Sequence, residues 1–150
     1  MDRVEINAMI DREKAALGSL VEFRRFFFPA RDDVPPAPFH MEWSDILLRG
    51  DRHFVVEAFR ESAKTQIVIR ANLLHALAYP QPHRSYLVVI CSTQRAASKK
   101  LQECSRELAA SDAIRALVEK VVEDSGLALE VQYRSGQRVR IEAYGKGAAV

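Results

Sequence analysis

Apolar residues recur every three or four positions over several stretches of the chain, which is the period of a helix with one buried face. In the stretch that follows Lys64, this spacing places Ile67, Ala71, Leu74 and Ala78 on one side. The same period predicts further helices over residues 2–17, 20–28, 39–49, 94–108 and 111–124. We therefore expect much of the chain to form amphipathic helices.

Other stretches have the apolar runs or the alternation of strands. Residues 53–56 are a short β-branched and aromatic run, and residues 86–91 are a near-continuous apolar run, typical of a strand buried on both faces of a parallel sheet. Residues 127–133 and 138–144 alternate around a turn, which predicts a β-hairpin with Val139 and Ile141 inward. Two strands joined by a helix make a βαβ unit, so the pattern predicts an α/β fold.

The polar, proline-rich stretch 31–38 is typical of a rigid linker. We expect an N-terminal helical segment with this linker over residues 1–38, and an α/β domain with a mostly parallel sheet and an added hairpin over residues 39–150. After the hairpin, residues 145–150 carry no cap and no final helix. The chain reads as though it were cut within a loop.

A polar loop, residues 57–63, separates the apolar run 53–56 from the helix that follows Lys64. Strand, loop, Lys-Thr and helix are the layout of a phosphate-binding loop. Such a loop binds phosphates through backbone N–H groups at a helix N-terminus, with a lysine on the β and γ oxygens and a hydroxyl on Mg²⁺. Here residues 61–63 would supply the amides, Lys64 the charge and Thr65 the hydroxyl.

Two alanines stand where such a loop usually has glycine. Ala58 and Ala63 occupy the first and sixth positions, so the loop requires negative φ at both. The alternative is an ordinary strand-to-helix turn with a solvated lysine. The candidate nucleotide-binding residues of the loop are Ala58, Phe59, Arg60, Glu61, Ser62, Ala63, Lys64, Thr65 and Gln66.

The helix over residues 39–49 leads directly into the strand before the loop. In many nucleotide-binding domains the segment before this strand closes over the adenine, so His40 and Trp43 are candidates for base contacts. For Trp43, packing in the core is the favoured alternative. Thr65 is the candidate Mg²⁺ ligand.

Composition and charge restrict the classes of protein. The 150 residues are 48% hydrophobic and 28% charged, which is ordinary for one globular domain and argues against disorder. A net charge of +2 is too small to indicate nucleic-acid binding by itself. Basic residues do gather near the start of the helix 94–108. They could contact a nucleic-acid backbone, or they could form a face that is only solvated. Those residues are Arg95, Lys99, Lys100 and Arg106.

Cysteines and histidines give no metal-binding pattern. Cys91 and Cys104 have no ligand spacing and are expected to be buried thiols of a reducing compartment. The four histidines include no His-x-x-x-His pair. Without a membrane-spanning stretch or a signal-peptide core, we expect a cytoplasmic protein with no membrane partner.

Residues 121–124, Val-Val-Glu-Asp, imitate the acidic strand that positions Mg²⁺ and the attacking water in phosphate-loop ATPases. The preceding residues keep a helical period, and Ser125 and Gly126 end a helix rather than a strand. We therefore predict that residues 121–124 belong to a helix and hold no metal.

Taken together, these motifs resemble the N-terminal ATPase region of the phage terminase large subunit, the motor that packages viral DNA. The resemblance rests on residues 55–65, where the family has a divergent phosphate loop with an internal arginine, matched by Arg60, Lys64 and Thr65. It continues in residues 88–97 and in the hairpin leading to residues 144–147. Residues 39–42 look like the helix that precedes the family's loop. The resemblance covers nearly the whole chain, and its motifs are short and degenerate.

The resemblance implies a P-loop NTPase-like three-layer α/β fold with ATP and Mg²⁺ as ligands. Lys64 would bind the β and γ phosphates, Thr65 would ligate Mg²⁺, and Arg60 would lie near the γ phosphate, so that Arg60 and Lys64 are the candidate catalytic residues. It also implies double-stranded DNA, other motor subunits, the small terminase subunit and the portal as partners of the full-length protein, in the bacterial host cytoplasm.

Two parts of the family pattern are missing. No apolar strand ends in Asp-Glu, and the carboxylate cluster of the family's nuclease is absent, so the chain resembles an incomplete fragment that lacks later strands. Without the acidic strand, we expect nucleotide binding with little or no hydrolysis. Because missing strands would expose an apolar edge, we also expect self-association or marginal stability.

Two other functions are weighed against the packaging motor. A helicase-type ATPase fragment shares the βαβ core and the polar exit from the second strand, but the internal Arg60 and the hairpin favour terminase. An inactive prophage remnant or interaction module, in which Ala58 and Ala63 mark decay, would fold without binding nucleotide.

Overall fold

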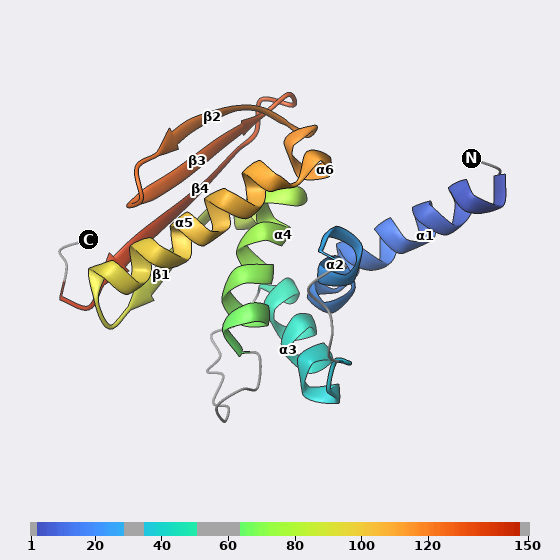
Figure 1. Cartoon of the computed structure of the whole chain (residues 1–150), viewed down its shortest axis with the longest axis horizontal. Helices are drawn as coiled ribbons and strands as arrows, with labels where there is room; N and C mark the ends of the chain where they lie inside the picture. Colours follow the sequence, from blue (N-terminus) through green and yellow to red (C-terminus); the bar gives the residue numbers. More distant parts are fainter. Residues whose placement is uncertain (1–2, 29–34, 51–63, 148–150) are drawn as a thin grey trace. The chain divides into compact units, whose positions relative to one another are not determined.

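The computed structural model describes residues 3–28, 35–50 and 64–147. The chain divides into two compact units, Met1–His75 and Ala76–Val150. Helices make up the described part of the first unit, and the second contains a four-stranded sheet with helices (Figure 1). The expected mixed α/β architecture is confirmed. The predicted domain boundary after residue 38 stays a prediction.

The first unit contains α1 (Arg3–Gly18), α2 (Leu20–Phe27), α3 (Pro38–Arg49), the π-helix η2 (Thr65–Ala71) and the start of α4 (Asn72–Ala78). These helices lie where the apolar spacing predicts them. Ser19 begins α2, because its Oγ accepts a hydrogen bond from the N–H of Glu22 at 3.3 Å. Gly50 ends α3 in a left-handed conformation, with φ of 65°, which a residue without Cβ adopts readily.

The core of the first unit joins α2, α3 and η2. Leu20, Val21, Ile67 and Ala71 form a buried cluster, and partly buried side chains of α3 pack against it, namely Trp43, Leu47 and Leu48. The predicted apolar face of the helix after Lys64 is thus confirmed, and Trp43 has the packing role that the sequence favoured.

The second unit contains the 3₁₀ helix η3 (Pro82–Arg84), β1 (Tyr86–Cys91), α5 (Gln94–Ala110), α6 (Asp112–Arg115), β2 (Val118–Asp124), β3 (Ala128–Tyr133) and β4 (Arg138–Gly145). The strand order is β1-β4-β3-β2. β1 and β4 are parallel, whereas β4 with β3 and β3 with β2 are antiparallel. The expectation of a mostly parallel sheet is therefore wrong for the described strands, because two of their three ladders are antiparallel, one from the hairpin and one from β2.

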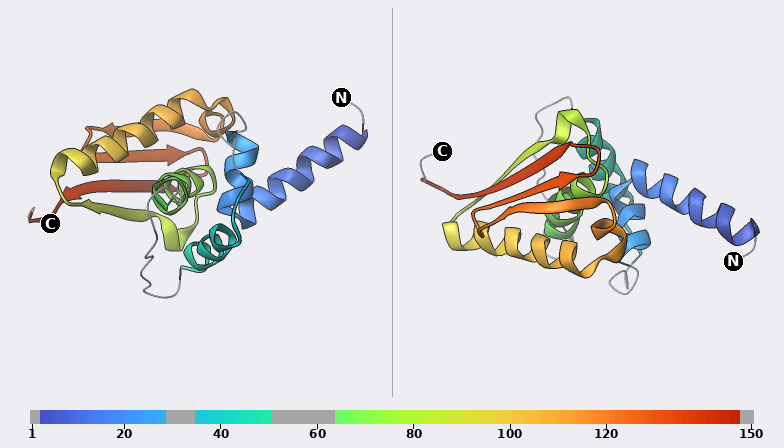
Figure 2. Two further views of the ribbon diagram at one scale, coloured as in Figure 1. Left: turned by 60° about the horizontal axis from the view of Figure 1, so that its bottom comes forward. Right: turned by 90° about the horizontal axis from the view of Figure 1, so that it is seen from above.

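Helix α5 packs on the sheet, mainly against β4, and covers one of its faces (Figure 2). The apolar residues at helical spacing along α5 are buried, namely Ala97, Leu101, Cys104 and Leu108. Val139 and Ile141 of β4 are fully buried, which confirms the predicted hairpin and its inward residues. Alternate residues of β4, from Arg138 to Tyr144, belong to the opposite face.

Strand β1 differs from its prediction in burial. The exposed fractions of Tyr86, Val88 and Ile90 are 55%, 40% and 68%. Among the described residues β1 pairs only with β4, and α5 covers only one face of the sheet. The prediction of a strand buried on both faces is therefore wrong here, since an apolar run alone does not show how many layers cover a sheet.

Residues 111–124 also differ from their prediction. The helix that Ser111 caps ends after one turn, at Arg115, and β2 follows. Val118, Val121 and Val122 are β-branched and favour the strand conformation. Pairing with β3 gives this segment backbone partners along one edge, so tertiary pairing overrides the helical spacing.

Candidate functional site

Lys64 and Thr65 are the central residues of the predicted phosphate loop, and they lie at the start of the described helical segment 64–78. Lys64 has helical dihedral angles, φ −49° and ψ −51°, and η2 begins at Thr65. Both residues are exposed, whereas Ile67 is buried. An exposed lysine and hydroxyl at a helix start are accessible to a ligand from solvent.

The first seven residues of this helix after Lys64 are π-helical rather than α-helical. The N–H of Asn72 donates to the carbonyl oxygen of Ile67, five residues earlier. Short π-helical segments are rare and often occur at functional sites. Gln66 is held by its own helix, because its Oε1 accepts a hydrogen bond from Arg70 Nη1 at 3.0 Å.

The other predicted loop residues lie outside the described residues: Ala58, Phe59, Arg60, Glu61, Ser62 and Ala63. The same applies to the predicted strand at residues 53–56. The conformation required at the two alanines and the role of Arg60 therefore stay predictions.

His40 lies at the start of α3, where it takes part in helix capping. Its Nδ1 accepts a hydrogen bond from the N–H of Ala37 at 3.1 Å. The imidazole also lies 4.3 Å from the ring centroid of Phe39 and 5.4 Å from that of Trp43. Helix α3 packs against η2, so His40 and Lys64 come from neighbouring helices of one unit. Adenine contact by His40 stays a prediction.

In the second unit, the ends of β1 and β4 meet the N-terminus of α5. Thr93 caps α5 by accepting a hydrogen bond from the N–H of Ala96. Gln94 Oε1 accepts from the N–H of Gly145 at 2.8 Å, and its Nε2 donates to the carbonyl of Ala143 at 2.9 Å. Gln94 thereby binds the end of β4 to the start of α5.

Sequence reasoning missed the pairing of Gln94 with Gly145, although both residues stand in segments that it singled out. A Cβ on Gly145 would lie 2.3 Å from the backbone nitrogen of Gln94, so only glycine fits. The available signal was a glycine at the end of a predicted strand, which often marks close backbone approach.

The acidic residues 123 and 124 lie on a strand and not on a helix, so the stated reason for excluding a metal-positioning role is wrong. Their side chains are engaged within the fold. Glu123 Oε2 accepts from Arg140 Nη1 at 2.8 Å, and Asp124 Oδ2 accepts from Ser105 Oγ at 2.5 Å. β2 is also antiparallel to its neighbour β3. In the described ranges, no group of His, Cys, Asp and Glu is arranged to hold a metal ion.

Arg140 and Glu142 form the centre of a polar network that spans all four strands. Arg140 contacts Glu123 of β2, Glu130 of β3 and Glu142 of its own strand, at 2.6 to 2.8 Å. Tyr86 of β1 donates its hydroxyl to Glu142 at 2.6 Å. The network lies on the sheet face opposite the buried residues and is suited to holding the strands in register.

Hydrogen bonds in this network determine the ionisation of Glu142. Those from Tyr86, then Tyr144, then Arg140 lower the pKa of Glu142 from 4.5 to about 2. The same bonds raise the pKa of both tyrosines. Glu142 is thus a stable carboxylate at neutral pH, unlike a general acid, whose pKa must lie near the working pH.

Two surface grooves lie elsewhere. One of about 320 Å³ is lined by residues of α5, α6 and β2, including Leu108, Arg115 and Val121. Another of about 410 Å³ is lined by Arg12, Glu22, Arg25 and Phe26. Neither includes a predicted site residue. No helix in the described ranges is long and apolar enough to cross a bilayer.

Comparisons with protein-family models, with curated proteins and with solved structures found no match for this chain.

Proposed function

We propose that this chain is the ATP-binding part of a large terminase subunit, the motor that moves phage DNA into proheads. The observation that carries the proposal is the exposed Lys64-Thr65 pair, in the first described turn of a helix that buries Ile67 and Ala71. A phosphate site needs this combination, because the helix must be anchored while its first residues stay open to the ligand.

The second unit supports the same proposal. β1 ends in the polar residues 92–94, α5 follows, and a hairpin leads to Gly145. The terminase resemblance extends to residues 88–97 and to this hairpin, and α6 and β2 lie between them in place of the predicted helix. Ligands of α/β sheets bind beyond the carboxyl ends of parallel strands, and β1 and β4 both end beside α5.

The proposed roles follow from the chemistry of each group. Lys64 binds the β and γ phosphates, Thr65 ligates Mg²⁺, and Arg60 stabilises charge near the γ phosphate. Glu123 and Asp124 are engaged by Arg140 and Ser105, so they do not supply the missing carboxylates. The chain accordingly binds ATP with Mg²⁺ and hydrolyses it slowly or not at all.

Calorimetric titration with a non-hydrolysable Mg-ATP analogue tests the proposal. We expect micromolar binding by the wild type and a loss of about 10- to 100-fold in Lys64→Ala, since hydrogen bonds to charged groups contribute about 1.5–3 kcal/mol. Lys14→Ala removes an equally exposed lysine from α1 and should leave binding unchanged. Circular dichroism must show that all three proteins fold.

Thr65 gives a second, independent test. Thr65→Ala should weaken binding in Mg²⁺ and leave the weaker binding in EDTA unchanged, whereas Thr65→Ser keeps the hydroxyl and should behave as the wild type. A folded wild type that binds no nucleotide would overturn the proposal and favour the inactive remnant.

A further inference from the structure

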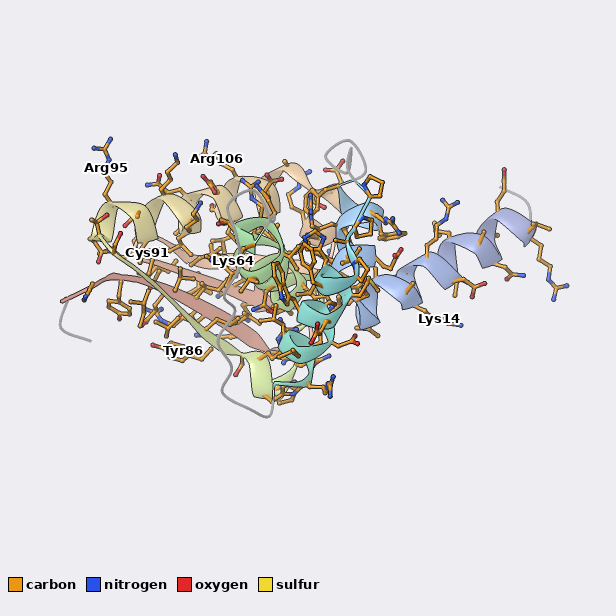
Figure 3. The ribbon with its side chains drawn as sticks, turned by 90° about the horizontal axis from the view of Figure 1, so that it is seen from below. Lys14, Lys64, Tyr86, Cys91, Arg95 and Arg106 are labelled. Carbon is orange, nitrogen blue, oxygen red and sulfur yellow. The ribbon has the colours of Figure 1, made fainter. Side chains whose placement is uncertain are left out.

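Helix α5 carries three cationic side chains in one line along its outer face. Arg95, Lys99 and Arg106 are exposed, and they lie within an arc of about 60° at 100° per residue. At 1.5 Å per residue the line is about 16 Å long. We call these three residues the basic stripe. Figure 3 shows Arg95 and Arg106 pointing away from the sheet on the same side of α5.

The basic stripe forms no ion pair with the acidic residues of its own helix. In the part of the chain that the structure describes, none of its three residues forms an ion pair. Glu103 lies one turn from Lys99 and Arg106 but pairs with Lys100 at 3.6 Å, and Glu107 is buried. By contrast, Arg138 and Arg140 on the sheet are both paired with glutamates. The stripe is therefore a line of three positive charges without an ion-pair partner on its own helix.

The chemistry of the stripe's surroundings favours a polyanion with regularly spaced charges. Gln102, an exposed hydrogen-bond donor, lies on the same arc. Arg106 donates its Nε to the carbonyl of Gln102 at 3.3 Å, which leaves its terminal nitrogens for a ligand. Arginine, lysine and glutamine are the usual donors to nucleic-acid phosphates. An anionic membrane is disfavoured, because a membrane-binding helix needs exposed apolar residues, and this arc has none.

We propose that the basic stripe of α5 binds the phosphate backbone of double-stranded DNA without reading its sequence. The choice of a polyanion rests on the stripe alone, and the choice of duplex DNA rests on the proposed packaging function. The stripe includes neither Lys64 nor Thr65, so we expect DNA binding by α5 without nucleotide.

Fluorescence anisotropy with a labelled duplex, in the absence of nucleotide and Mg²⁺, tests this inference. Three phosphate contacts give a slope of log K against log salt of about −2.7, or about a 40-fold loss of affinity between roughly 50 and 200 mM salt. The triple variant Arg95→Gln, Lys99→Gln, Arg106→Gln should lose at least about 10-fold in affinity at the lower salt and most of the slope.

A matched triple variant controls for net charge. Arg3→Gln, Arg12→Gln, Lys14→Gln removes the same charge from exposed positions of α1 and should keep the affinity and slope of the wild type. Equal losses in both triples would overturn the proposal, as would a folded wild type that binds no DNA. Equal, stripe-dependent binding of polyglutamate would also overturn it, in favour of an acidic protein partner.

The two proposals fail separately. Lys64→Ala is expected to bind DNA like the wild type, and the stripe triple is expected to bind the Mg-ATP analogue like the wild type. Loss of DNA binding in Lys64→Ala would contradict the assignment to α5.

Discussion

At Gly145, strand β4 passes directly against the backbone of α5. An added Cβ would meet the backbone of Gln94 and of Thr93, at 2.3 and 2.8 Å, and backbone atoms at a helix start have little room to shift. We expect Gly145→Ala to destabilise the second unit by about 1–3 kcal/mol or more, as overpacking does. Thermal unfolding followed by circular dichroism measures the change. Gly18→Ala, in a helix with open space around it, should instead stabilise by about 0.5–1 kcal/mol.

His75 is a buried polar residue whose function is structural. Its Nε2–H donates to the carbonyl of Leu17 at 2.9 Å, and its ring lies 5.3 Å from that of Phe23. His75→Ala removes this donor and leaves a cavity, so we expect a loss of about 1–3 kcal/mol or more in denaturant unfolding. The exposed His83→Ala is the control, and an equal effect of both substitutions would contradict this role.

At the scale of elements, the four strands are joined by the network around Glu142 and Arg140. The folded-state pKa of Glu142, about 2, lies below its ordinary value of 4.5. The stabilisation from Glu142 is therefore fully present above about pH 5 and is lost as the pH falls towards 2. We expect the melting temperature to fall over this range. Glu142→Gln should melt lower at pH 7 and show a smaller decrease in acid; an unchanged pH profile would contradict the assignment.

The elements also differ in how far the sequence predicts them. The helices after Lys64 and after Thr93 and the hairpin were predicted correctly, because each has a sustained period and clear end signals. Helical spacing of three valines predicts a helix for residues 118–124. The same three β-branched residues also suit an edge strand. Only pairing with β3 decides between these two conformations.

At the scale of the whole molecule, the exposed apolar side chains of β1 predict self-association. Ile90 is 68% exposed, β1 contains no charge or proline, and among the described residues only β4 pairs with it. Sedimentation velocity should show concentration-dependent association that Ile90→Lys reduces. Val4→Lys, on the exposed face of α1, should have no such effect. A monodisperse, cooperatively melting wild type would contradict this prediction.

The sequence by itself determined the hairpin and most of the helices, including the one that carries Thr65, because these depend on local period, caps and turns. Tertiary structure decided what depends on distant neighbours: the strand at residues 118–124, the single covered face of β1, and the contact between Gly145 and Gln94. The same holds for the roles of Glu123 and Asp124. A carboxylate in a sequence can hold a metal or pair with an arginine, and here Arg140 and Ser105 are the partners that the fold supplies.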